Sequence, residues 1–428
     1  MIAASPRRLV PSVVVAMVLL SGASFVIFPL IPALQGSLGV TTAEIGFLAA
    51  AGFGAALIAE LLVAPLADRG HARLMAIVGV LMVAGSLGLS AAASEGWQLI
   101  LARGVGGFGF GIFVIAGSAL LIRSDPARSG ELLGRLGAAE LAGIAIGPLA
   151  SGVALSFSGT SAILAVAAVV VLLALIPVLV GFREAHSPAR KAGAATDEDG
   201  SALDDEPYPA TGGIAAGVIG FDGTDASSSL RLGAAPRSSF DLLRSKRLVG
   251  VVLLYAAVMV PTGAYDGIWP RFMADIGATP LLTAASYVMF AVPYVIVAGW
   301  AGRMADRRGG VSAYWRGLAI LLPIIALYAV VGNPWVATGM GFVESTGQAL
   351  AFIGAAAAMA HAVDPARAGS AQGLLRGIGL VAATIAAAFS GIMYEVGGQL
   401  LLFGGTAAVV VVLGVVGLLL ARERRARS

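Results

Sequence analysis

Six charged side chains interrupt stretches of sequence that are otherwise almost entirely apolar. They are Glu60, Arg103, Glu140, Asp266, Glu344 and Arg376. If these stretches cross a bilayer, a charge near its centre costs about 2.5–3.5 kcal/mol, so each should face a cavity and have a partner. A carboxylate removed from water takes up a proton more readily, whereas a nearby arginine favours its charged form. These residues, and Gln348 one helical turn beyond Glu344, are therefore candidates for proton coupling or for a substrate cavity.

Other kinds of chemistry have little support in the sequence. The chain has no cysteine and only three histidines, which disfavours disulfides, thiolate metal sites and imidazole metal cages. The stretch Gly104–Gly109 spells G-x-G-x-x-G, but it lies in an apolar run with no strand before it and does not predict a dinucleotide site. No catalytic constellation indicates an enzyme, so we expect no catalytic residue, no metal and no cofactor.

The composition requires that most of the surface faces lipid. Of 428 residues, 58% are hydrophobic and 12% are charged, against about 25% charged in an ordinary soluble domain. A helix that crosses a bilayer needs roughly 20 apolar residues. Twelve such runs predict an all-α membrane protein, and they extend approximately over Leu9–Ala33, Ile45–Leu66, Leu74–Ala93, Leu99–Leu121, Leu132–Phe157, Ala162–Val180, Leu248–Trp269, Leu282–Ala301, Trp315–Val331, Val336–Ala360, Leu374–Tyr394 and Leu400–Ala421.

A long polar segment divides the twelve runs into two sets of six. We expect a six-helix bundle over 1–182, a flexible linker over 183–247 and a second six-helix bundle over 248–428. Arg103 and Arg376 fall inside apolar runs, and Arg271 lies in a connection on one face of the membrane. The other 24 of the 27 basic residues lie in the termini and connections on the opposite face. Because cytoplasmic loops carry the excess of Lys and Arg, both termini and the linker should be cytoplasmic. The same pattern explains the net charge of +3 without a nucleic-acid partner.

The two sets of six runs are related by an internal repeat. Asp125–Arg128 (Asp-Pro-Ala-Arg) before the fifth run recurs as Asp364–Arg367 before the eleventh, and Ser151-Gly152 recurs as Ser390-Gly391 at the same offset. Two halves with the same inside-out sense are parallel repeats. Such halves are related by an axis along the membrane normal, and substrate binds where they meet.

Two motifs carry a resemblance to the major facilitator superfamily, in particular to its twelve-helix drug:proton antiporters. Gly302, Asp306, Arg307 and Gly309, between the eighth and ninth runs, resemble the motif G-x-x-x-D-R-x-G. Its first-half copy keeps Asp68 and Arg69 but has Ala64 at the leading position and Gly70 one residue early. In the fifth run the antiporter motif G-x8-G-x3-G-P-x2-G-G is matched, with Ser151 as the one departure, by Gly134, Gly143, Gly147, Pro148 and Gly152.

Physical reasons support these residue types. The acidic and basic groups near helix ends form charge-assisted bonds that hold one side of such a protein shut. Glycines four residues apart allow helices to pack closely, and Pro148 bends the helix by freeing a backbone carbonyl.

The resemblance also implies roles for the charged residues. In this superfamily the first, fourth, seventh and tenth spans line a central cavity, and an arginine placed like Arg103 is linked to proton coupling. We therefore expect Glu344 to face Arg103 across the cavity and to carry the proton. Glu60 and Glu140 should pair with Arg135 or Arg376. Asp266 is either an outer-gate or substrate contact, or an interface anchor with Arg271, and aromatic residues of the second half should mostly contact lipid or pack.

The function expected is proton-coupled efflux of a small organic molecule across the cell membrane by alternating access. The protein should be monomeric, with the bilayer and a small-molecule substrate as its partners and the proton gradient as its driving force. A sugar or metabolite permease, working as an uptake symporter, is the alternative. A membrane-embedded enzyme and a non-transporting receptor are less favoured.

Overall fold

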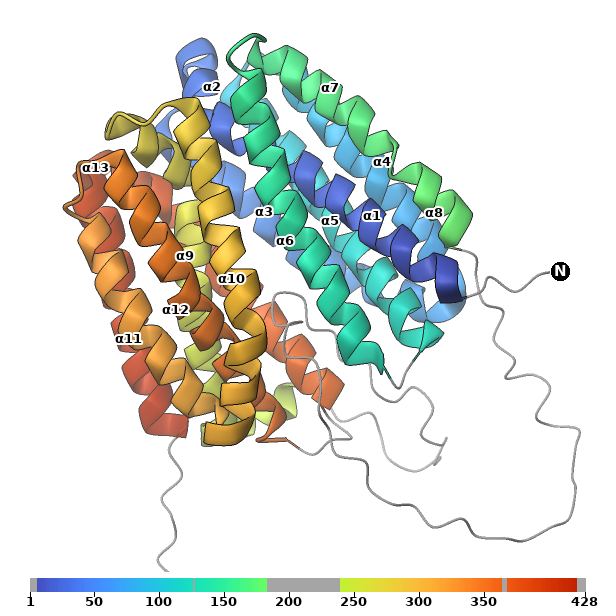
Figure 1. Ribbon diagram of the computed structural model, residues 1–428, viewed down its shortest axis with the longest axis vertical. Helices are drawn as coiled ribbons and strands as arrows, with labels where there is room; N and C mark the ends of the chain where they lie inside the picture. The colour runs from blue at the N-terminus through green and yellow to red at the C-terminus, as the bar shows by residue number, and fades with distance from the viewer. Residues whose placement is uncertain (1–5, 126–127, 183–238, 364–367, 422–428) are drawn as a thin grey trace, which may run out of the picture.

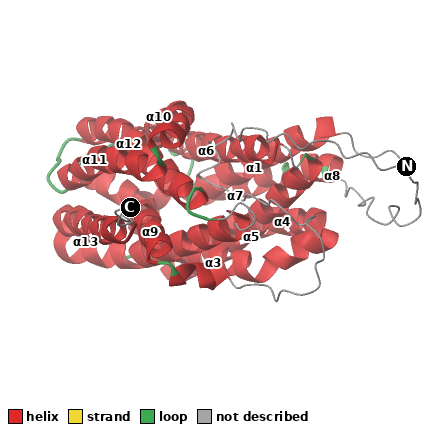
Figure 2. Cartoon of the chain, turned by 90° about the horizontal axis from the view of Figure 1, so that it is seen from below, coloured by secondary structure: helices red, strands yellow, loops and turns green. Residues whose placement is uncertain are grey.

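The computed structural model describes residues 6–125, 128–182, 239–363 and 368–421, and all regular elements in these ranges are helices. Figure 1 shows two bundles side by side, an N-terminal half formed by the elements α1 to α8 and a C-terminal half formed by η6 to α13. The same division is seen from one end of the molecule in Figure 2. The prediction of an all-α protein with two helical halves is confirmed.

The first crossing of the N-terminal half is broken into α1 (Pro6–Phe25), η1 (Phe28–Leu30) and α2 (Ile31–Leu38). Pro29 and Pro32 lie at this break, where the missing amide hydrogens of proline remove helical hydrogen bonds. The other elements of this half are α3 (Thr42–Leu66), η2 (Ala67–His71), α4 (Ala72–Ala91), α5 (Gly96–Ser124), α6 (Ser129–Ala154), α7 (Thr160–Leu172) and α8 (Leu175–Gly181).

The C-terminal half contains η6 (Ser239–Arg244), α9 (Lys246–Asp275), α10 (Pro280–Arg308), α11 (Gly310–Tyr328), α12 (Pro334–Ala360) and α13 (Ala368–Ala421). α13 has 54 residues, more than twice the length that a bilayer requires. It is interrupted at Gly398, whose φ of 59° and ψ of −155° are not helical. Only glycine adopts this conformation readily, so Gly398 divides α13 into two crossings.

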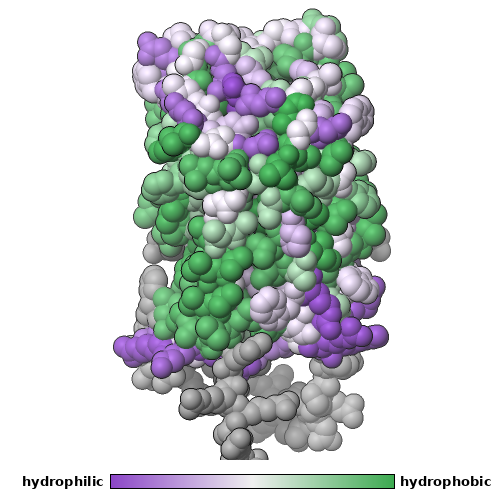
Figure 3. All heavy atoms as spheres, turned by 90° about the vertical axis from the view of Figure 1, so that its left-hand side faces the viewer, coloured by the Kyte–Doolittle hydropathy of each residue, from purple (hydrophilic) through white to green (hydrophobic). Residues whose placement is uncertain are grey.

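Ten helical stretches among the described residues are long and apolar enough to cross a membrane. They omit α12, whose 27 residues suffice in length but include Glu344 and Gln348, and they count both crossings of α13 once. With these two additions the described residues contain the twelve predicted crossings. Figure 3 shows the matching surface on the C-terminal half, a hydrophobic belt between two polar ends.

The two halves approach each other closely at one end of the molecule. We call the end where α1 begins and α13 finishes the terminal end, and the opposite one the far end (Figure 1). A Cβ atom on Gly46 of α3 would lie 2.7 Å from the carbonyl oxygen of Ala387, and one on Gly391 of α13 would lie 2.3 Å from that of Thr42. Because α3 begins at Thr42, these contacts close the far end.

The glycines of the fifth run pack helices together, as predicted. A Cβ on Gly147 of α6 would lie 2.0 Å from the carbonyl oxygen of Gly22 in α1, and one on Gly143 would meet Ser21 at 1.9 Å. A Cβ on Gly152 would approach Ala284 of α10 to 2.4 Å, so this glycine lies where the halves meet. Gly134 is buried, and Pro148 lies within α6.

We expect Gly147→Ala to destabilise the protein. Its new methyl group would overlap the backbone of α1, which a side-chain rotation does not relieve, and overpacking of this kind costs about 1–3 kcal/mol. Thermal unfolding of the purified protein should therefore begin at a lower temperature. Gly88→Ala in α4 is the matched control, because no atom lies within 4 Å of its added Cβ. Equal stability of the two variants would contradict this packing.

Both copies of the repeated Asp-Arg motif end in a glycine with positive φ, Gly70 at 89° and Gly309 at 85°. The glycine that comes one residue early in the first copy therefore still provides the left-handed turn. Gly302 is buried, whereas Asp306 and Arg307 are exposed. The side chains of Asp68 and Arg69 lie outside the described residues, as do Asp364–Arg367 and most of the expected linker. The last residues of that linker, 239–247, are helical and belong to η6 and α9.

Candidate functional site

A cavity of about 330 Å³ lies between the two halves. Its volume falls within the range of small-molecule sites, which is about 300–1,000 Å³. Along α9 its lining extends from Tyr255 to Trp269, which is about 21 Å at 1.5 Å per residue. All seven residues proposed for proton coupling or substrate contact line it, namely Glu60, Arg103, Glu140, Asp266, Glu344, Gln348 and Arg376. The structure therefore places these residues in one cavity. Their roles in transport remain predictions.

Arg103 is held in the N-terminal half by the broken first crossing. Its guanidinium donates a hydrogen bond of 2.9 Å to the carbonyl oxygen of Ser24, one of the last carbonyls of α1. Such carbonyls have no partner within their own helix and carry the negative end of its dipole. The same guanidinium lies 5.1 Å from the ring centre of Phe28 and 6.0 Å from that of Phe25. The break at Pro29 thus creates the site that receives Arg103.

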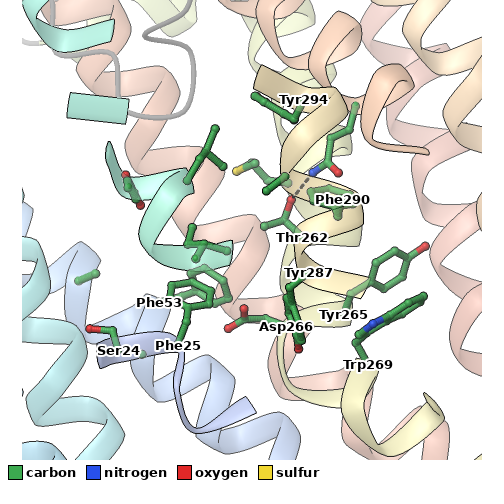
Figure 4. A pocket seen from close by; sticks show the side chains of 18 of the residues that line it. Ser24, Phe25, Phe53, Thr262, Tyr265, Asp266, Trp269, Tyr287, Phe290 and Tyr294 are labelled. Atoms are coloured by element: carbon green, nitrogen blue, oxygen red, sulfur yellow. Dashed lines mark hydrogen bonds between the residues drawn. The ribbon is translucent and has the colours of Figure 1, made fainter. Parts of the chain in front are cut away.

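The acidic partner of Arg103 is Asp266 in the C-terminal half. Nη2 of Arg103 lies 3.9 Å from Oδ2 of Asp266, and both side chains are mostly buried. Figure 4 shows Asp266 on the side of α9 that faces Phe25, so it points toward the N-terminal half. The expectation that Glu344 is the partner of Arg103 is wrong. Asp266 does not pair with Arg271 either, because Arg271 bonds Asp275 one turn along α9.

Glu344 lies deeper in the C-terminal half. Its Oε2 accepts a hydrogen bond of 2.9 Å from the hydroxyl of Tyr328 at the end of α11. Gln348, one turn further along α12, donates a hydrogen bond of 2.8 Å to the hydroxyl of Thr262 in α9. These bonds fix both polar groups of α12 against neighbouring helices of the same half.

A second ion pair joins the halves nearer the terminal end. Nε of Arg376 in α13 lies 2.7 Å from Oε1 of Glu60 in α3. Glu140 of α6 is close enough to interact electrostatically with both, and its Oε2 is buried without a hydrogen-bond partner among the described residues. The predicted pairing of Glu60 with Arg376 is confirmed. Arg135 instead pairs with Glu131, one turn away on α6.

Aromatic side chains form much of the remaining cavity wall, contrary to the expectation for the second half. They come from both halves and include Phe25, Phe53, Tyr265, Trp269, Tyr287, Phe290, Tyr294 and Tyr328. Trp269 donates a hydrogen bond of 2.8 Å to Ser286. A signal for part of this wall was present in the sequence, because Tyr265 and Trp269 lie one helical turn apart beside Asp266. Tyr328 and Thr262 had no such signal.

Comparisons with known proteins agree with this architecture. The sequence matches the Major Facilitator Superfamily over residues 13–265 and 248–428. It is 27% identical to Multidrug resistance protein MdtG of Proteus mirabilis (strain HI4320) over 409 residues. The aligned region covers 91% of this chain and 90% of that protein.

Solved structures share the fold at low sequence identity. A bacterial homologue of the human lysosomal transporter Spinster, inward-facing and occupied, gives a TM-score of 0.75 at 13% identity over 100% of both chains. The nucleoside transporter NupG gives a TM-score of 0.64 at 15% identity over 97% of this chain and 100% of its own. With its membrane-crossing helices, its central cavity and its match over both halves, this chain is a transporter and not an enzyme, and it belongs to the Major Facilitator Superfamily.

Proposed function

We propose that the protein exports a small organic molecule across the cell membrane in exchange for protons. The observation that carries this proposal is the buried Arg103–Asp266 pair, which joins the two halves across a cavity of substrate size. Rocking of one half against the other must change the distance between these groups. The likeness to a protein named for multidrug resistance supports export.

The proposed cycle assigns the proton to Asp266. When the halves bring Arg103 close, the guanidinium favours the charged carboxylate, and the proton leaves from the side to which the cavity is open. When the far end opens and the pair separates, the buried carboxylate takes a proton from that side. Sequence reasoning gave this role to Glu344, but Glu344 makes its hydrogen bond within its own half. Its environment therefore changes less when the halves move.

The structure represents the inward-facing state in this scheme. Two features support the assignment: the glycine contacts that close the far end, and the likeness to two inward-facing structures, unoccupied and occupied, of a bacterial homologue of Spinster. The terminal end is then cytoplasmic, as the distribution of Lys and Arg predicts. We further propose that a single chain is the transporting unit, since each half supplies one partner to each of the two ion pairs.

Transport by the purified protein in liposomes tests this function. With an imposed pH gradient and a panel of organic solutes, we expect solute movement against the proton flow, reported by a pH-sensitive dye trapped in the lumen. Proton movement in the same direction as the solute would instead show an uptake symporter. Binding of solutes without any flux would show a receptor, and either result would overturn the proposal.

A further inference from the structure

Glu344 is a buried carboxylate with an unused oxygen. Its side chain is only 2% exposed, and while Oε2 accepts the hydrogen bond from Tyr328, Oε1 has no hydrogen-bond partner among the described residues. The two arginines that line the cavity are engaged elsewhere, Arg103 with Asp266 and Arg376 with Glu60. Because a buried charge requires a partner, a charged Glu344 would need a cation or a donor at Oε1.

Aromatic rings cluster around Tyr328, which donates its hydroxyl to this carboxylate. The ring of Tyr328, which holds Glu344, lies 5.2 Å from that of Trp269 and 6.1 Å from that of Tyr265, at angles of 78° and 87°. The hydroxyl of Tyr265 is buried and has no hydrogen-bond partner among the described residues. Figure 4 shows Tyr265 and Trp269 projecting together from α9, on the side away from Phe25. Electron-rich ring faces attract organic cations, most strongly where water is excluded.

Space is available beside the carboxylate. Glu344, Tyr265, Trp269 and Tyr328 all line the cavity, as does Gly341, one turn before Glu344. A Cβ added to Gly341 would meet its nearest neighbour, the hydroxyl oxygen of Tyr328, at 3.5 Å, which is an ordinary contact. Packing at this point of the wall is therefore not tight, and a small shift of the wall gives a ligand group access to Oε1, which is enclosed in this structure.

We propose that Glu344 binds the ammonium group of an amphipathic organic cation, with Tyr265, Trp269 and Tyr328 around that group. An ammonium N–H would donate to Oε1, while the apolar body of the ligand would lie along the aromatic wall toward Phe290. The C-terminal half thus holds the substrate's charge, and the Arg103–Asp266 pair remains free for the proton. This inference rests on the proposal that the cavity is the transport site.

Equilibrium binding to the full-length protein in lipid nanodiscs, without any gradient, tests the inference. The probes are 4-phenylbutylamine, which is protonated at neutral pH, and the neutral 4-phenylbutanol, both measured by calorimetry. We expect the ammonium to bind at least about tenfold more tightly than the alcohol, as a charge-assisted bond with cation–π contacts provides. Equal affinities of the wild-type protein for the two probes would overturn the proposal without any variant.

Variants locate the site. Glu344→Gln keeps the volume and an oxygen to accept the bond from Tyr328, so the protein should remain folded, lose its preference for the ammonium and bind the alcohol as before. Gly339→Ala, also in α12 but exposed, outside the cavity and with no atom within 4 Å of its added Cβ, should keep the preference. Undiminished preference in Glu344→Gln would refute the inference.

The result of the ammonium-binding test can be distinguished from the result of the transport test of the proposed function. Proton exchange with neutral solutes, combined with no ammonium preference, would leave the transport proposal standing and refute only the ammonium site. An ammonium preference that depends on Glu344, combined with no proton movement in liposomes, would support the site and refute proton coupling.

Discussion

We expect replacement of Asp266 by asparagine to abolish transport driven by a pH gradient and to leave solute binding measurable. Asparagine resembles the protonated carboxylic acid in shape and cannot release a proton. Gradient-driven uptake into liposomes should fall to the level of protein-free liposomes, since one carboxylate is proposed to carry the coupling. Solute exchange without a gradient should continue, because it requires the movement of the halves but no proton.

The same substitution leaves Arg103 without its acidic partner. Removing one member of a buried ion pair costs about 3–5 kcal/mol, so the variant should also unfold at a lower temperature. Asp275→Asn is the matched control, because Asp275 lies on the same helix and also pairs with an arginine, Arg271, but in an exposed position. Full gradient-driven transport by Asp266→Asn would remove Asp266 from the mechanism.

The crossings and the two halves followed from the sequence because their cause is local. Each crossing is a run of apolar residues, and the repeat at a constant offset shows that the halves correspond. The break in the first crossing was not predicted, although Pro29 and Pro32 account for it by removing helical hydrogen bonds. α12 was identified although its hydropathy is reduced by Glu344 and Gln348, since its length and flanks remained those of a crossing.

The partners of the charged residues were harder to predict because they depend on the rotation of each helix about its axis. Arg103 and Glu344 lie at corresponding depths in the two halves, but depth does not say in which direction a side chain points. Asp266 faces the N-terminal half, whereas Glu344 turns toward Tyr328 inside its own half. The pair of Glu60 and Arg376 was predicted because the sequence offers few other basic residues at that depth in the membrane.

Replacing Gly391 with alanine should shift the protein away from the state in which the far end is closed. The added Cβ would lie 2.3 Å from the carbonyl oxygen of Thr42, and both are held by helical backbone. An overlap of this kind costs about 1–3 kcal/mol, which corresponds to a shift in equilibrium of about 5- to 150-fold. Because the overlap exists only while the halves touch, the cost falls on the closed far end and not on the open one.

Distances between spin labels measure this shift. The chain has no cysteine, so Ser37→Cys in the N-terminal half and Val396→Cys in the C-terminal half provide the only labelling sites, both exposed at the far end. We expect Gly391→Ala to enlarge the population with the longer distance between them. Gly373→Ala, also in α13 but with no atom within 4 Å of its added Cβ, should leave the distribution unchanged. If the two variants give the same distribution, the contact at Gly391 does not control closure, and the far end must be held by the other interface contacts, such as the bond from the Ala43 amide to Glu395.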